Sequence, residues 1–428
     1  MIGKLATLIG TLVPASMAAS APIYIQAGRL LAVPGSPMRG ASTIVVEGER
    51  IVEVREGHLT PPEGATFIDL RGQTVLPGLI DSHVHLASDR GGEAGLLAFV
   101  REEPRLNALE AQMNGMKTLR AGFTTVRNLG DGGSTLALRE AIKRGWVQGP
   151  RIIDAAESIS TTGGHMDGRG ALNDDLVAHL PSPENLCDGV DACRKVVRRQ
   201  IDRGADVIKF ATTGGVNSGT GLATRMFENE ARALVETAHA YGRKVAVHAH
   251  GADGIKLALR AGADSIEHGT VMDDEILRTM KKQGTYYVPT LSTVNGYLER
   301  LAANPNAYAP DVKKQIDWRI GITGQSLAKA YPAGVKIAFG TDAGVSKHGR
   351  NADEFELMVK WGMPPGEAIR AATVNAADLL GLASEIGTIE PGKSADMIAV
   401  EGDPLADVRV LKSVGFVMAR GEVITPPR

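Results

Sequence analysis

The sequence has few of the features that mark several common protein classes. It contains two cysteines, three Trp, seven Tyr and eight Phe in 428 residues, and its formal net charge is −2. No basic run with interleaved aromatic residues occurs, which argues against a nucleic-acid-binding surface. Beyond the first residues, no stretch is apolar enough to span a bilayer. The length suits one barrel of about 250 residues with a smaller module.

The first residues have the pattern of a secretory signal. Lys4 precedes an apolar run over 5–13, and Ala19-Ser20-Ala21 offers small side chains at the spacing that a signal peptidase accepts. We interpret residues 1–21 as a signal peptide, and we expect a periplasmic or secreted protein without membrane attachment after cleavage. The alternative is an apolar arm or a buried N-terminal strand.

That compartment affects how the two cysteines are interpreted. Cys187 and Cys193 lie six positions apart in a segment rich in Asp, Gly and Pro. In an oxidising compartment such a pair can close a small disulfide, whereas in the cytosol both would be free thiols. Two thiolates without neighbouring histidines make an incomplete metal site. We therefore favour the disulfide.

The most informative motif is a His-x-His sequence at the end of an apolar run. Residues 75–80 are followed by Asp81-Ser82-His83-Val84-His85. Alternate residues of a strand share a face, so His83 and His85 can bind one metal ion.

Four further segments share this design, an apolar strand with a potential ligand near its carboxyl end. They are 207–210 with Lys209, 245–250 with His248 and His250, 265–269 with His268, and 337–344 with Asp342. Helical stretches separate them at 228–241, 253–261 and 273–283. Strands that alternate with helices predict parallel β/α units. In a closed (β/α)8 barrel, all strands end on the face that carries the active site. We expect the remaining strands at 124–129, 151–159 and 286–291.

These motifs resemble the amidohydrolase superfamily of binuclear metal hydrolases, from about Ile23 to Glu422. The resemblance implies that Lys209 is carboxylated and bridges two divalent ions, which we expect to be zinc. It also implies the full set of metal ligands, which are His83, His85, Lys209, His248, His268 and Asp342. Geometry alone does not decide between His248 and His250, because both lie on one face of a strand. The family's His-x-His-Gly pattern selects His248.

Both ends of the chain contribute to a second domain. Short strands are predicted at 24–31, 42–54 and 66–73 before the barrel, and at 395–400 and 414–424 after it. We expect an α/β protein in which a TIM-like barrel at 75–383 carries a small β-sandwich. The sandwich is composed of residues 22–74 and 384–428, as the resemblance also implies.

The expected chemistry follows from two metals and one carboxylate. The two ions would activate a water and polarise the scissile carbonyl, while Asp342 acts as base and then as acid. Asp81 and Glu267, which neighbour ligands, are candidates to orient imidazoles. Loop positions at the catalytic face are expected to contact substrate, namely Ser88, His165, Val216, His250 and His348.

The amino-acid sequences of the motifs are most similar to those of the prolidase-like and imidazolonepropionase-like branch. Within it, the sequence looks close to secreted metallocarboxypeptidases and ochratoxin A amidohydrolases. We therefore expect hydrolysis of the amide bond of dipeptides or N-acyl amino acids by a homo-oligomer. A cyclic-amide hydrolase is the first alternative. A non-catalytic, assembly-forming relative is the second, although such a protein would be expected to have lost ligands.

Overall fold

The computed structural model describes residues 21–427 except 171, 181, 218 and 219. The predicted signal peptide, residues 1–21, therefore lies outside the described residues apart from Ala21. In the part that is described, no helix combines the length and apolar character needed to cross a membrane.

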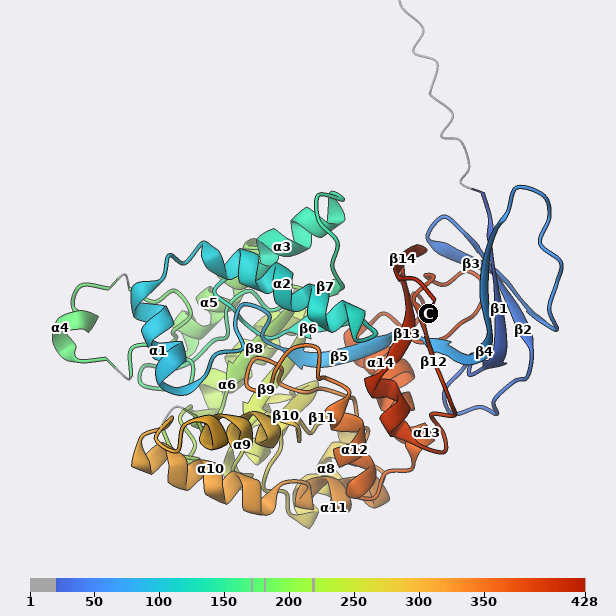
Figure 1. Ribbon diagram of the computed structural model, residues 1–428. Helices are drawn as coiled ribbons and strands as arrows, with labels where there is room; N and C mark the ends of the chain where they lie inside the picture. Colours follow the sequence, from blue (N-terminus) through green and yellow to red (C-terminus); the bar gives the residue numbers. More distant parts are fainter. Residues whose placement is uncertain (1–20, 171, 181, 218–219, 428) are drawn as a thin grey trace, which may run out of the picture.

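Both chain ends form one seven-stranded sheet, shown on the right of Figure 1. Its strand order is β14-β13-β12-β4-β1-β2-β3. β1 and β4 pair in parallel and all other neighbours are antiparallel. The strands are β1 (Ile23–Leu30), β2 (Ser42–Glu47), β3 (Arg50–Glu56), β4 (Thr66–Pro77), β12 (Met397–Val400), β13 (Val414–Ala419) and β14 (Glu422–Thr425). The pairing of β4 with β12 unites the two ends of the chain, as predicted.

The sheet bends around its own apolar core. Ile25, Ile44, Val75, Met397 and Phe416 are buried in one cluster. At the far edge, the Ile51 amide donates to the Lys393 carbonyl at 2.9 Å, so β3 reaches the segment that precedes β12. One continuous sheet thus encloses a core in the manner of a sandwich.

Two segments predicted as single strands are hairpins. The segment 42–54 turns at Gly48, whose φ is +55°, and the segment 414–424 turns at Arg420 and Gly421, with φ of +51° and +76°. Left-handed backbone reverses the chain in tight hairpins, and glycine adopts it without a Cβ clash. These turns are difficult to predict from the sequence, because the residues on both sides of each turn are strongly apolar and look like one strand.

The barrel consists of two parallel sheets that join into a closed ring. One sheet contains β5 (Leu79–Val84), β6 (Phe123–Asn128) and β7 (Arg151–Asp154). The other contains β8 (Val207–Ala211), β9 (Lys244–Ala249), β10 (Ser265–His268) and β11 (Tyr286–Val288). Parallel bridges close the gaps, and they are Ile159 to Phe210, Tyr287 to Ile337 and Val84 to Ala343. The segment 337–343 therefore occupies the eighth strand position, although it pairs only through single bridges.

Helices follow the barrel strands and surround them (Figure 1). After the first three strands come α1 (Gly92–Arg101), α2 (Leu106–Arg120), α3 (Ser134–Lys143), α4 (Asp174–Val177) and α5 (Val190–Asp202). After the next three come α6 (Glu228–Ala240), α7 (Ala252–Ala261) and α8 (Asp274–Gln283). The last two positions lead into α9 (Thr293–Ala303), α10 (Pro310–Ile322), α11 (Gln325–Ala333), α12 (Asp353–Lys360), α13 (Pro365–Arg370), a π-helical turn (Ala371–Asn375) and α14 (Ala376–Leu380). A 3-10 helix (Val408–Lys412) precedes β13.

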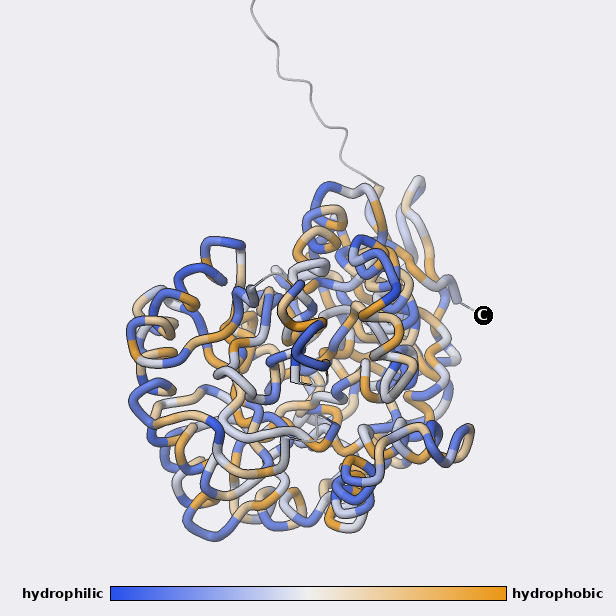
Figure 2. The backbone as a smooth tube through the Cα atoms, turned by 90° about the vertical axis from the view of Figure 1, so that its left-hand side faces the viewer, coloured by the Kyte–Doolittle hydropathy of each residue, from blue (hydrophilic) through white to orange (hydrophobic). Residues whose placement is uncertain are grey.

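Helix α8 illustrates why these segments form where they do. The Asp273 side chain accepts a hydrogen bond from the Ile276 amide at 2.9 Å, which caps the first turn. Gly284 ends the helix in the left-handed conformation, with φ of +74°. Ile276 and Met280 form part of its buried face. In Figure 2, hydrophilic stretches gather along the outer turns of the tube, as expected for helices with one buried side.

A disulfide joins Cys187, in the loop before α5, to Cys193 in the first turns of that helix. Both side chains are buried, and the Cys187 amide donates to the Ser160 carbonyl at 2.8 Å. The bond thus anchors the long loop that follows β7.

Gly78, at the junction of the sheet and the barrel, offers a test of this packing. A Cβ at Gly78 would lie 2.2 Å from Thr124 Oγ1, whereas a Cβ at Gly72 on β4 would meet nothing within 4 Å. We expect Gly78→Ala to lower the free energy of unfolding by about 1–3 kcal/mol, because overpacking displaces β6. Denaturant unfolding of both variants measures this. An equal effect of Gly72→Ala would contradict the close contact between β4, β5 and β6.

Candidate metal centre

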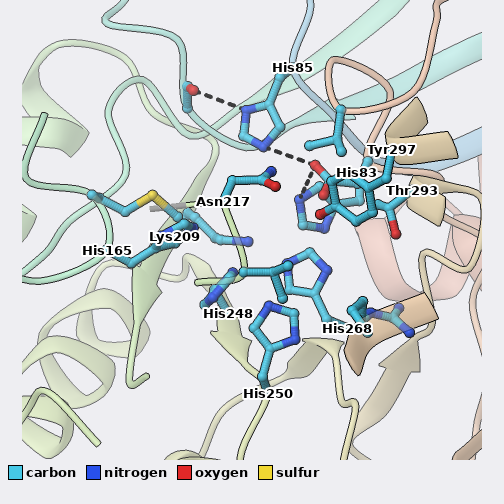
Figure 3. Close-up of a pocket in the computed structure, with 16 residues that line it drawn as sticks. His83, His85, His165, Lys209, Asn217, His248, His250, His268, Thr293 and Tyr297 are labelled. Atoms are coloured by element: carbon cyan, nitrogen blue, oxygen red, sulfur yellow. Dashed lines mark hydrogen bonds and ion pairs between the residues drawn. The ribbon is translucent and has the colours of Figure 1, made fainter. Parts of the chain in front are cut away.

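A cavity of about 300 Å³ opens at the carboxyl ends of the barrel strands (Figure 3). All six predicted metal ligands line it, although they come from five different strand positions. Figure 3 shows the labelled imidazoles and the Lys209 side chain pointing into one shared space. The complete lining is His83, His85, Gly130, His165, Met166, Lys209, Val216, Asn217, His248, His250, His268, Thr293, Tyr297, Arg319, Asp342 and Val345.

The donor atoms form one continuous cluster. Ligand atoms of His83, His268 and Asp342 lie within 4.8 Å of one another, and so do those of His248, His250 and His268. Asp342 Oδ1 is 3.5 Å from His83 Nε2 and 3.4 Å from His85 Nε2. Imidazole nitrogens and carboxylate oxygens are a donor set that suits zinc and similar divalent ions.

A buried ion-pair network fixes the orientation of His83. Glu267 Oε2 lies 2.8 Å from His83 Nδ1, and Arg127 Nη2 donates to Glu267 Oε1 at 2.8 Å. Burial alone would raise the pKa of Glu267, but Arg127 and His83 outweigh it and lower that pKa to about 2. Glu267 therefore stays ionised and holds His83 with Nε2 toward the cavity, as predicted.

Asp81 has a different role from the one predicted. Its carboxylate accepts hydrogen bonds from the His83 amide at 3.1 Å, from Thr341 Oγ1 at 2.6 Å and from Asn351 Nδ2 at 2.8 Å. The prediction that Asp81 orients an imidazole is wrong. Because it accepts from backbone, hydroxyl and side-chain amide groups, it joins β5 to the eighth strand position and to the segment that follows it instead.

Burial keeps most of the histidines neutral. It lowers the pKa of His83, His248, His250 and His268 well below the usual value, because the charged form is poorly solvated there. A neutral imidazole has a free lone pair, which metal binding requires. The pKa of Asp342 moves the other way and is raised by burial.

Lys209 is the unusual member of the cluster. Its side chain is 1% exposed, and Nζ has no hydrogen-bond partner among the described residues. Burial lowers the pKa of this amine to about 8, although Glu267 and Asp342 oppose the shift. Buried polar groups are nearly always satisfied, so an orphan amine in a cavity lined by candidate metal ligands requires an explanation. A group added to Nζ that bonds to metal would supply one.

Backbone strain is concentrated at the same strand ends. His268, Thr290 and Asp342 have φ of +69°, +47° and +57°, in the left-handed region that residues other than glycine seldom adopt. Such conformations persist only where the surrounding structure imposes them, and they cluster at functional sites. The fold thus places two candidate ligands at a conformational cost.

The structure separates the predicted substrate contacts into two groups. His165, Val216 and His250 line the cavity. Ser88 and His348 do not, which corrects their predicted position. His348 is buried behind the first strand, with Nε2 3.0 Å from the His85 carbonyl and Nδ1 3.2 Å from Thr118 Oγ1. Ser88 Oγ accepts from the Arg90 amide at 3.1 Å, so it stabilises a turn.

Several lining residues were not predicted. Thr293 and Tyr297 come from α9, Arg319 comes from α10, and Asn217 follows β8. No motif marks these positions. For Arg319, the sequence offers one signal, which is that it lies three residues after the apolar Ile316 and would share a helix face with it. In the structure both residues are almost fully buried, which is unusual for an arginine.

Comparison with known proteins agrees with this geometry. A sequence model described as the amidohydrolase family matches residues 74–424. The chain is 31% identical over 429 residues to ochratoxinase of Aspergillus niger, covering 94% of this chain and 86% of that protein. It is 26% identical over 370 residues to imidazolonepropionase of Nocardia farcinica, covering 79% and 80%. A crystal structure of a Xaa-Pro dipeptidase with methionine bound in its active site superimposes with a TM-score of 0.89 at 40% identity, covering 94% and 99%.

The fold and the donor cluster define a barrel hydrolase of a type that is usually metal-dependent. The chain belongs to the amidohydrolase family, in its prolidase-like and imidazolonepropionase-like branch. It is a hydrolase that acts on C–N amide bonds.

His248 and His250 can be distinguished by metal content. Their ring centroids are 4.7 Å apart, and His250 Nδ1 is already 2.7 Å from Thr270 Oγ1. We expect His248→Ala to lose metal, and we expect His250→Ala to keep it with altered turnover. Elemental analysis after gel filtration measures this, with exposed His179→Ala as the control. Metal lost only from the His250 variant would reverse the assignment.

Proposed function

We propose that this protein is a binuclear metal-dependent amidohydrolase that cleaves dipeptides or N-acyl amino acids in the manner of a carboxypeptidase. The observation that carries the proposal is the convergence of six potential ligands, Lys209 among them, on one cavity. The similarity to a Xaa-Pro dipeptidase supports it, because that name denotes an enzyme that cleaves dipeptides, and the similarity to an ochratoxinase points to ochratoxin as a further substrate type. We include ochratoxin-type amides among the accepted substrates.

The residues present fit a pair of divalent ions, which we propose to be zinc. Addition of carbon dioxide to Lys209 Nζ would form an N–C bond, release a proton and convert the amine into a carbamate with two donor oxygens. The carbamate, Asp342 and four histidines, His83, His85, His248 and His268, would then hold the ions. When bound, the ions supply Lewis acidity that polarises the scissile carbonyl and acidifies a water molecule.

Asp342 is placed to move the proton. Burial raises the pKa of its carboxyl group, which favours a group that accepts a proton and then releases it. In the proposed reaction, Asp342 takes a proton from the attacking water as the new C–O bond forms. It then donates that proton to the leaving nitrogen as the C–N bond breaks. The products are a carboxylic acid and a free amino acid.

The proposal extends to location and assembly. A disulfide between Cys187 and Cys193 supports export to an oxidising compartment after cleavage of residues 1–21. Exposed apolar side chains on neighbouring helices α1 and α2 support a homo-oligomer, because such groups commonly mark interfaces. They are Leu97, Val100, Leu106, Leu109 and Met113.

A substrate panel tests the proposed function. We expect the metal-loaded enzyme to release phenylalanine from N-acyl-phenylalanine and from an ochratoxin-type amide. Cyclic substrates, namely a hydantoin, a lactam and an imidazolone, should be turned over poorly. Removal of metal by a chelator should abolish activity, and added zinc should restore it. Turnover of the cyclic amides alone would instead establish the imidazolonepropionase-like alternative.

A further inference from the structure

Arg319 is a buried cation at the edge of the cavity. It lies on α10, its residue is 3% exposed, and it lines the same space as the candidate metal ligands. One guanidinium nitrogen, Nη1, donates to Thr323 Oγ1 at 2.9 Å on the same helix. This single neutral acceptor leaves most of the donor capacity of the guanidinium available to other groups.

No carboxylate in the described part of the chain lies within 4.0 Å of the Arg319 guanidinium. Arg127, the other arginine of similar burial, is different. It donates to Glu267 Oε1, to Ser265 Oγ and to the Ser82 carbonyl. Buried charges in proteins are normally paired, because an isolated one is costly to desolvate. Arg127 is paired with a carboxylate of the protein, whereas Arg319 is not. A bound anion would therefore supply the missing partner of Arg319.

The surroundings of Arg319 show where such an anion would bind. Arg319 lines the same cavity as His250 and Asp342. The anion would therefore lie beside the reacting groups.

Arg319 is also next to an apolar part of the lining. Val216, Tyr297 and Ile316 form one buried cluster, with Val345 packed against it. Ile316 lies one helical turn before Arg319, and the other three line the cavity. A ligand with a negative charge and an adjacent apolar side chain matches this combination.

We propose that Arg319 binds the free α-carboxylate of the substrate, and that the apolar cluster of Val216, Tyr297, Ile316 and Val345 receives the side chain of the same amino acid. This inference rests on the proposed function and narrows it to amides whose amine half is an apolar α-amino acid. The planar guanidinium can hold a carboxylate through two parallel hydrogen bonds, which fixes the position of the neighbouring amide.

The test compares N-acyl-phenylalanine with its carboxamide, which keeps the shape but removes the negative charge. The enzymes are the metal-loaded wild type, Arg319→Met, Arg319→Lys and a control, Lys314→Met, which removes an exposed charge from the same helix. We expect Arg319→Met to raise KM for the carboxylate about 10- to 100-fold and to leave the carboxamide nearly unchanged. Arg319→Lys should show a smaller rise in KM than Arg319→Met, because lysine keeps the positive charge but lacks the two parallel N–H donors of the guanidinium. The control should match the wild type.

Binding of L-phenylalanine, a predicted product, gives an independent readout. Calorimetry should show a loss of affinity in Arg319→Met similar to the rise in KM, with metal content and thermal midpoint close to wild type. Equal loss for both substrates, or unchanged phenylalanine affinity, would overturn the role of Arg319. Failure of the proposed function is distinguishable, because the wild type would then hydrolyse neither substrate, whatever its affinity for phenylalanine.

Discussion

The site depends on the buried contact of Glu267 with Arg127 and His83, which come from three strands of the barrel. All three side chains are at most 2% exposed. An ion pair of this kind gains little stability over an apolar core, because desolvation offsets the attraction. Its value here is geometric. It fixes one nitrogen of His83 toward a carboxylate and leaves the other facing the cavity, so the barrel presents an oriented ligand rather than a mobile one.

The same constraint explains the remaining charges. Burial keeps most of the cavity histidines uncharged, and it also disfavours the charged form of Lys209. Arg319 is a second buried cation at the same cavity. Neither cation has a paired carboxylate within the described residues. For Lys209, a carbamate would replace the positive charge with a metal-binding group. For Arg319, the substrate itself would supply the missing charge. The cavity thus contains two buried cations without a carboxylate partner. In the proposed reaction, one of them becomes the metal-binding carbamate and the other binds the substrate.

The convergence of the candidate ligands could be predicted from the sequence because each lies at a fixed place in a repeating strand pattern. His83 and Asp342 are examples, since parallel strand ends converge in a closed barrel. Arg319 could not be predicted this way, because it projects from a helix that follows β11 and carries no motif. His348 follows the eighth strand position like a lining residue, yet its loop folds back against the first strand. Long-range packing of this kind leaves no periodic signal in one sequence.

The metal content of the purified chain tests the central claim most directly. Elemental analysis should give about two divalent ions per wild-type chain, and Lys209→Ala should bind fewer because the bridging group is lost. Added short carboxylic acids should partly restore both metal and activity to that variant. One tightly bound ion in the wild type, with the same content in Lys209→Ala, would contradict the binuclear centre.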